Sequence, residues 1–253
     1  MSILSHEKVI ELARKYCFPG GIKFNLPKDP WTVMESEPGF FVVFEDAFSH
    51  GLRVPVPSFA ISALRSFGLH PSLLQPQSWS FVMGFMVKCI ESEVVVTVNL
   101  FREFHVLSAS PGKRGYFFKS RLGAKKLLIN PTKSMKHWKG RYFLIKNLPG
   151  FTAPRWCDFL ETHPLNKRSR LSSTEKTDLG RLLSLEAEEA NSVVLEDLLI
   201  QAGLSVMPGQ VSHLSDADDA PGGGDSERGG NRNRSMPVVA GESCIKTSSP
   251  PFH

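Results

Sequence analysis

The sequence predicts an α+β fold in which an N-terminal helical core precedes a small basic antiparallel sheet, two short acidic helices and a disordered tail. Three observations predict it. Apolar residues recur at helical spacing in the first part of the chain, and short aromatic runs between turn residues follow them. From residue 207 onward Gly, Pro, Ser, Asp, Asn and Arg dominate the composition. The 41% hydrophobic content therefore indicates a packed core over part of the chain, diluted by polar segments.

Helix-start and helix-stop residues bound the first predicted helices. Ser5 is a candidate N-cap for a short helix that ends before residues 19–21, Pro-Gly-Gly, with Val9 and Leu12 on its inner face. Ser58 is the candidate N-cap of a second helix, and Gly68 lies at its C-terminal end. The inward residues of this second helix are Phe59, Ala60, Ile61, Leu64 and Phe67.

The helix predicted over residues 79–90 is apolar on two sides. One face is built by residues at helical spacing, and Phe81 and Phe85 make the opposite side apolar. That first face consists of Trp79, Val82, Met83, Met86, Val87 and Ile90. A helix of this kind belongs at the centre of the core. A third short helix is expected over residues 100–107.

The apolar run of residues 40–44, FFVVF, has two interpretations that periodicity does not separate. It is either a buried strand or the first turns of a helix that continues to Gly51. Three later runs, at 116–118, 126–129 and 141–145, are short, aromatic or β-branched, and are separated by Gly, Asn-Pro and Lys-Gly turns. We expect these three to be the strands of one small basic antiparallel sheet.

A capping-box pattern at residues 172–175 opens a helix with Leu179, Leu182, Leu183 and Ala190 facing inward. A second short helix over residues 194–202 ends at Gly203. Beyond it, too little apolar surface is present to offset the entropy of ordering the chain. The predicted organisation is a domain at 1–170, an acidic helical extension at 171–206 and a disordered tail at 207–253.

Charge is distributed unevenly along the chain. Residues 104–157 contain twelve Lys and Arg and no Asp or Glu, whereas residues 175–203 contain seven acids against Lys176 and Arg181. An acid-free block of this kind implies a basic surface that RNA or another single-stranded nucleic acid can meet. The candidate contacts are Lys113, Arg114, Lys119, Arg121, Lys125, Lys126, Lys136, Trp138, Lys139 and Arg141. The competing interpretation is a solvated sheet face, with aromatic side chains such as Tyr116 and Tyr142 facing the core and lysines facing water.

The sequence offers no set of residues typical of catalysis. A transposase or integrase needs three carboxylates around two metal ions, and the acid-free block has none. Cys157 and His163 lack the second cysteine and the spacing of a zinc knuckle, and neither a Ser-based nucleophile elbow nor a phosphate-binding Gly loop is present. We therefore expect no enzyme activity, no metal or cofactor and no small-molecule ligand.

No segment is long and apolar enough to cross a membrane. The most apolar run, residues 79–89, is well short of the roughly 20 residues that a span requires. The first residues do not follow a secretory signal pattern, and the four cysteines are scattered. These features predict a soluble protein of the cytoplasm or nucleus.

Residues 44–55, FEDAFSHGLRVP, resemble the signature Y/F-E-x-A-F/L-x-x-G-L-R-x-P of the plant gypsy-type transposon domain. Further similarity follows in the same order over about residues 5–165. It includes LRSFGLH at 64–70, LQPQSW at 74–79, NLFREF at 99–104, GYFF at 115–118 and KHWKGRYF at 136–143. Phe44 and Gln77 stand where Tyr and Asn are usual in the family.

The resemblance implies an origin in a Ty3/gypsy-like plant retrotransposon, on the gag side of the element. It implies structural roles for the signature residues Glu45, Gly51, Leu52, Arg53, Pro55 and Trp79. Gly51 is expected to end the preceding helix. Arg53 is expected to cap the carbonyls of that helix or to pair with Glu45 or Asp46.

Three functions are compatible with these observations. The first is a non-enzymatic structural and interaction domain that contacts nucleic acid through a basic sheet. The second is a protein–protein assembly module in which the basic block of one copy meets the acidic helices of another, unless those helices fold back on their own chain. The third, a DNA-processing transposase, follows only from the name of the family.

Overall fold

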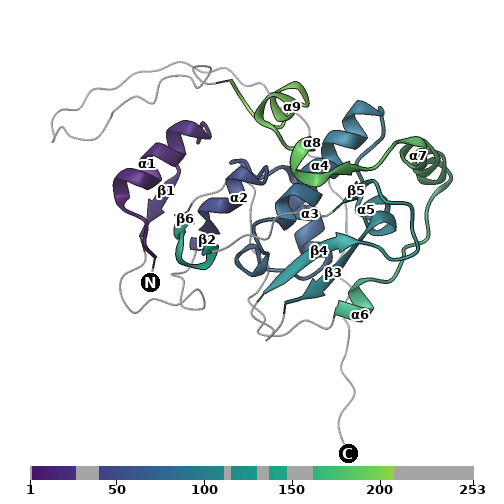
Figure 1. The fold of residues 1–253 in the computed structure, drawn as a ribbon, viewed down its shortest axis with the longest axis horizontal. Helices are drawn as coiled ribbons and strands as arrows, with labels where there is room; N and C mark the ends of the chain where they lie inside the picture. The colour runs from purple at the N-terminus through teal and green to yellow at the C-terminus, as the bar shows by residue number, and fades with distance from the viewer. Residues whose placement is uncertain (1, 27–39, 111–114, 130–136, 147–161, 208–253) are drawn as a thin grey trace, which may run out of the picture. The chain divides into compact units, whose positions relative to one another are not determined.

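The computed structural model describes residues 2–26, 40–110, 115–129, 137–146 and 162–207 (Figure 1). The chain forms two units, Met1–Leu214 and Ser215–His253, and every described residue belongs to the first. This unit combines helices with two antiparallel sheets and one short parallel strand pair, so the predicted α+β class is confirmed. The predicted disordered tail falls outside the described residues, except for Met207.

A three-stranded antiparallel sheet has the order β1-β6-β2, where β1 is Lys23–Asn25, β6 is Tyr142–Lys146 and β2 is Phe40–Phe44. The last strand in sequence therefore lies between the first two. Opposite β2, Leu144 faces Val42 and Tyr142 faces Phe44. These four side chains form a small cluster of their own on one face of the sheet, while the other face joins the main core.

Helix α1, His6–Lys15, begins where predicted, because the Ser5 side chain accepts a hydrogen bond from the Lys8 amide. Helix α2, Glu45–Ser49, begins directly after β2. The strand interpretation of the FFVVF run is therefore confirmed, and the helical interpretation is wrong, because the helix begins only after the run, at Glu45. Residues 40–44 form a strand because they pair with β6 over their whole length. The helix begins at Glu45 and Asp46, because acidic side chains are favoured near the free N–H groups of a first helical turn.

The main helical layer consists of α3, Ser58–Ser66, α4, Ser78–Glu91, and α5, Val98–Phe104, with the short η2, Pro71–Leu73, between the first two. Helix α4 is buried over nearly its whole length, as its two apolar faces predict. Gly68 follows α3 with a positive φ of 57°, as expected. The predicted cap at Ser58 is wrong: Pro57 occupies the N-cap position and no side chain caps the helix.

A β-hairpin of β3, His105–Ala109, and β4, Tyr116–Ser120, packs beside these helices. The Phe118 amide donates to Ser78 Oγ at 3.0 Å, which fixes β4 at the start of α4. The prediction that the third helix includes Leu107 is wrong, since Leu107 lies in β3 opposite Phe118. Strand pairing with β4 takes precedence here over the apolar spacing of residues 100–107.

The three runs expected to form one basic sheet lie in three different sheets, and this prediction is wrong. One run is β4, and another is β6 in the β1-β6-β2 sheet. The third contributes β5, Leu128–Ile129, which pairs in parallel with β7, Glu188–Glu189. Strand β4 pairs with its neighbour β3, whereas β5 and β6 pair with strands distant in sequence. Each run lies where its apolar face covers a particular part of the helical core.

The C-terminal segment folds into the same core. It contains α6, Thr162–Leu165, α7, Ser173–Ser184, strand β7, α8, Ala190–Val193, and α9, Glu196–Gln201. The predicted capping box at Ser172 and Glu175 is present, and Gly203 follows α9 with a positive φ. Five apolar side chains of the segment are buried with the residues of α3 to α5, namely Leu182, Ala190, Val193, Val194 and Leu199. Leu183, expected to face inward, is 36% exposed instead.

Helices in the described part of the chain are too short or too polar to span a bilayer.

Candidate nucleic-acid interface

The structure divides the predicted nucleic-acid contacts between two places. Lys119, Arg121, Lys125 and Lys126 lie on β4 and in the turn that follows it. Trp138, Lys139 and Arg141 lie in or next to the 3₁₀ helix η4, Trp138–Gly140, which leads into β6 in a different sheet. Lys113, Arg114 and Lys136 lie outside the described residues.

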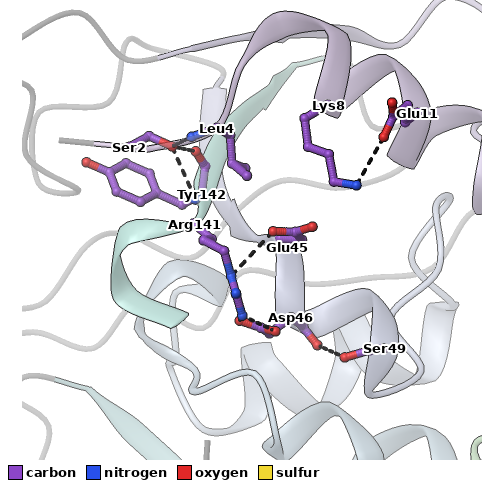
Figure 2. Close-up of polar contacts among 9 residues, drawn as sticks. All are labelled: Ser2, Leu4, Lys8, Glu11, Glu45, Asp46, Ser49, Arg141 and Tyr142. Carbon is purple, nitrogen blue, oxygen red and sulfur yellow. Dashed lines mark hydrogen bonds and ion pairs between the residues drawn. The ribbon is translucent and has the colours of Figure 1, made fainter. Parts of the chain in front are cut away.

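Arg141 forms ion pairs within the protein. Its guanidinium contacts both carboxylate oxygens of Asp46 at 2.7 Å and lies 3.4 Å from Glu45 Oε2 (Figure 2). The hydrogen bond that Arg141 donates to Asp46, together with the negative charges of Asp46 and Glu45, raises the pKa of Arg141 despite partial desolvation. Arg141 thereby joins β6 to the start of α2, and its charge is neutralised where it lies.

The neighbouring aromatic residues also serve packing. The Trp138 ring contacts Phe44 edge-on, with 4.7 Å between ring centroids, and Tyr142 is buried. Lys139 is exposed, with its ammonium 5.7 Å from the centroid of the Trp138 ring. On β4, Tyr116 and Phe118 are buried whereas Lys119 is exposed. Strand β4 therefore matches the competing interpretation, a solvated sheet face with aromatic side chains in the core and lysine in water. Tyr116 and Tyr142 are both buried, so they are not placed to stack on bases.

Arg121 occupies the junction of three chain segments. Its Nε donates to the carbonyl of Arg102 at 2.8 Å, and its Nη2 donates to the carbonyl of Asn166 at 2.9 Å. Asn166 in turn exchanges two hydrogen bonds of 2.7 Å with the backbone of Leu107 in β3. These contacts hold the turn after β4 beside residues 166–170, which are distant in sequence.

The segment beside Arg121 brings three further cations that the sequence interpretation assigned only to a domain boundary. Lys167, Arg168 and Arg170 follow Asn166 directly, and Arg168 Nε lies 3.2 Å from Glu103 Oε2. In the sequence, three basic residues within the four positions 167–170 indicate that this segment could belong to a basic surface. We call Arg121, Lys125, Lys126, Lys167, Arg168 and Arg170 together the basic surface.

Two neighbouring cations, Arg168 and Arg102, act on the charge of Arg121. Burial lowers the pKa of Arg121, and the positive charges of Arg168 and Arg102 lower it further, with Glu103 acting in the opposite direction. Lys126, Lys167 and Arg170 are exposed, and their side chains form no hydrogen bond or ion pair with any residue that the structure describes. Such unpaired cations around a cationic centre can bind an anion chain such as a phosphodiester backbone.

The signature residues of the family occupy a structural junction elsewhere. Arg53 is buried, and its Nη1 donates to the carbonyls of Phe48 and Leu52 at 2.9 and 2.7 Å. The expected capping of α2 carbonyls is therefore observed. The acidic partner of Arg53 is Glu196 at the start of α9, and the expected pairing with Glu45 or Asp46 is wrong. Trp79 and Leu52 are buried in the core.

Pro55 follows a cis peptide bond and lines a surface pocket of about 370 Å³. The guanidinium of Arg53 and the ring of Tyr16, which lie 4.8 Å apart, also line this pocket. Four of the five N–H groups of Arg53 are already used, by the backbone carbonyls of Phe48 and Leu52, by Ser205 and by Glu196. The pocket is lined by the signature segment on one side and by the residues that follow α9 on the other.

Gly51 is the signature residue with the most demanding geometry. Its φ is +94°, and a Cβ atom there would lie 3.1 Å from the Cβ atoms of both Met83 and Val194. We expect Gly51→Ala to destabilise the fold by about 2–4 kcal/mol, since it combines backbone strain with overpacking. Urea unfolding measures this. Gly123→Ala is the control, because Gly123 also has a positive φ but has open space around it, so it should lose only the strain contribution of about 1–2 kcal/mol. A loss as large as that of Gly51→Ala would contradict the overpacking argument.

The described residues hold no group of three or more His, Cys, Asp or Glu side chains placed to bind a metal. His50, Ser80 and Asn191 form a hydrogen-bonded set, with His50 Nδ1 at 3.2 Å from Ser80 Oγ and 2.9 Å from Asn191 Oδ1. Ser80 is completely buried, and the set links the end of α2 to α4 and α8. Burial raises the pKa of Cys89 to about 12, and Cys157 lies outside the described residues.

The signature region lies within the segment of the chain that matches a known protein family. Residues 42–109 match the sequence model of the family described as "Putative gypsy type transposon". This segment is a gypsy-type transposon domain. It runs from β2 to the end of β3 and includes Gly51, Arg53 and Trp79. Comparisons with curated proteins and with solved structures give no match.

The gypsy-type segment covers a shorter stretch than the resemblance over residues 5–165 suggests. Of the groups around Arg121, Arg102 and Glu103 lie inside the matched segment, whereas all six residues of the basic surface come after it in sequence. Strand β6 and helices α7 to α9 also lie outside the match and complete the fold around it.

Proposed function

We propose that this transposon-derived domain is a non-enzymatic, gag-side structural and interaction domain of a Ty3/gypsy-like plant element, and that it contacts single-stranded nucleic acid through the basic surface. One observation carries the proposal. The Arg121 hydrogen bonds bring the turn after β4 together with residues 167–170, so cations from two distant segments share one surface. Partners of this kind place the protein inside the cell.

Rigid placement favours phosphate binding by these side chains. Both backbone segments are fixed by Arg121 and Asn166, so little further ordering is needed when the cations meet phosphates. Binding by Lys and Arg releases counterions from the nucleic acid, which makes the affinity fall with salt. Three acids of the C-terminal segment, Glu188, Glu196 and Asp178, pair with Lys88, Arg53 and Arg181, none of which belongs to the basic surface.

We expect the triple substitution Lys126→Gln, Lys167→Gln and Arg170→Gln to weaken binding to a single-stranded RNA by at least about tenfold at low salt. The slope of log affinity against log salt concentration should become less steep by about 2, which is roughly 0.7 for each lost phosphate contact. Fluorescence anisotropy at several salt concentrations measures both quantities. None of the three side chains has a partner among the described residues, so the fold is expected to persist.

The matched control is Arg14→Gln, Lys15→Gln and Lys23→Gln, which removes three exposed positive charges from α1 and β1. It carries the same net charge as the first variant and should bind nearly as wild type. Equal losses in both variants would indicate a general charge effect, and the absence of binding by wild type at low salt would overturn the nucleic-acid part of the proposal.

The alternative functions have less support. In the assembly module, the acidic helices of one copy would meet the basic block of another, but here the C-terminal segment packs on its own chain. A DNA-processing enzyme would nick supercoiled plasmid in the presence of Mg²⁺ or Mn²⁺. We expect no nicking above that of a heat-denatured sample.

A further inference from the structure

A pocket of about 220 Å³ lies within the basic surface. Its apolar walls come from Phe104 at the end of α5, Ala124 in the turn after β4, and Leu179 and Leu183 on α7. Glu103, Lys125 and Arg168 complete the lining. Phe104 is almost fully buried and forms the floor, whereas Lys125 and Arg168 are exposed and lie at the mouth.

We propose that this pocket receives one unpaired nucleobase of a bound single strand, an inference that rests on the proposed function of the basic surface. The volume lies below the range of pockets for drug-sized ligands and suits a flat ring system of one or two rings. The apolar walls can contact the faces of the base, and such contacts tolerate any base identity.

The charged groups of the pocket match the rest of a nucleotide. Arg168 and Lys125 stand at the mouth, where the phosphates that flank an inserted base would lie. Lys125 is oriented by a hydrogen bond from its Nζ to the carbonyl of Leu183, and Arg168 is oriented by Glu103. The two cations are therefore held beside the opening and not spread into solvent.

Glu103 supplies the acceptor that an unpaired base needs. Its side chain is only 12% exposed, so its carboxylate is largely withdrawn from water while its charge is balanced by Arg168. Each of the common bases carries at least one N–H group on its Watson–Crick edge, which a carboxylate can accept. In a duplex these N–H groups are already bonded to the opposite strand. The pocket therefore selects single strands over duplexes.

The deciding experiment compares a thymidine 12-mer with an abasic phosphodiester of the same length and charge. We expect wild type to bind the thymidine strand at least about fivefold more tightly, with the same salt dependence for both, because the base adds contacts without adding charge. Ala124→Phe fills the pocket and preserves every charge. It should bring the affinity for the thymidine strand down to that for the abasic strand and leave the salt dependence unchanged.

The control variant is Ala187→Phe, because Ala187 is exposed and does not line the pocket. It should keep the wild-type preference for the thymidine strand. Equal, salt-dependent affinity of wild type for both strands would overturn the base pocket and leave phosphate binding by the basic surface intact. No binding of either strand at low salt would overturn both proposals.

Discussion

A chain that ends at residue 170 is expected not to fold, whereas a chain that ends at residue 207 is expected to unfold in the same cooperative transition as the full chain. The first of these ends at the predicted domain boundary and therefore lacks α7, α8 and α9. It loses five buried apolar side chains, among them Leu182, Val193 and Leu199, each at most 1% exposed. Burying a side chain of this size contributes about 1.5–3 kcal/mol, and a whole domain is stable by only about 5–15 kcal/mol.

The shorter chain also leaves polar groups of the core without partners. Arg53 loses Glu196 and Ser205, whereas Lys88 loses Glu188 and keeps its ion pair with Glu91 at 3.0 Å, so the uncompensated charge is that of Arg53. Removing one partner of a buried charge pair is strongly destabilising, because the remaining charge is neither hydrated nor compensated. The loss of packing and the loss of ion pairs therefore act in the same direction.

Circular dichroism with thermal unfolding measures this prediction on the two truncated chains and the full chain. The chain ending at 207 is the matched control, since it keeps every described residue and removes only residues 208–253. A sigmoidal transition of the 1–170 chain at the temperature of the full chain would show that the C-terminal segment is an appendage and not part of the core.

Acid is expected to unfold the protein largely through buried histidines, with His105 making the largest single contribution. His105 is fully buried, and no side chain of the described residues forms a hydrogen bond with its ring nitrogens. Four phenylalanine rings surround it, namely Phe81, Phe85, Phe101 and Phe104. Burial lowers the pKa of His105 from an ordinary value of 6.5 to about 3. The pKa of His70 falls to about 4 for the same reason.

Because burial lowers the pKa of both histidines, the free energy of unfolding decreases as the pH falls. Below pH 6.5 the unfolded chain binds a proton at His105 and the folded chain does not, so stability falls as the pH falls. The stability that the neutral ring maintains is fully present above pH 6.5 and is lost progressively toward pH 3. Each such histidine contributes a slope of about 1.4 kcal/mol per pH unit in this window.

We expect His105→Leu to reduce the slope of unfolding free energy between pH 6 and pH 4 by about 1.4 kcal/mol per pH unit. Leucine is close in volume and has no proton to bind, so the apolar surroundings are kept. Urea unfolding at pH 7, 6, 5 and 4 gives the slopes. His6→Gln is the control, because His6 is exposed on α1 and its removal should not change the profile. Parallel profiles for wild type and His105→Leu would contradict the assignment.

Local patterns predicted local structure well. The Ser5 cap of α1, the capping box of α7 and the positive φ after α3 depend on residues within a few positions of one another. The burial of α4 is explained by its two apolar faces. These features are determined by neighbouring residues, so the sequence contains the information directly.

The candidate site could be predicted only in part, because identical residue types have different roles in it. Arg121 and Arg141 belong to the same acid-free block, yet Arg121 binds two carbonyls beside the basic surface and Arg141 is neutralised by Glu45 and Asp46. Residues 167–170 lie far from Arg121 in sequence and beside it in the fold. Sequence spacing carries no signal for such contacts.

The sequence by itself determined helices α1, α3, α4 and α7, the gypsy-type signature of residues 44–55 and the excess of positive charge in residues 104–157. Only the tertiary structure decided which strands pair, where the acidic segment packs and which cations meet on one surface. The physical reason is the range of the interactions. Caps and helical faces depend on neighbours along the chain, whereas strand pairing and core packing depend on apolar surfaces that meet only after the chain has closed on itself.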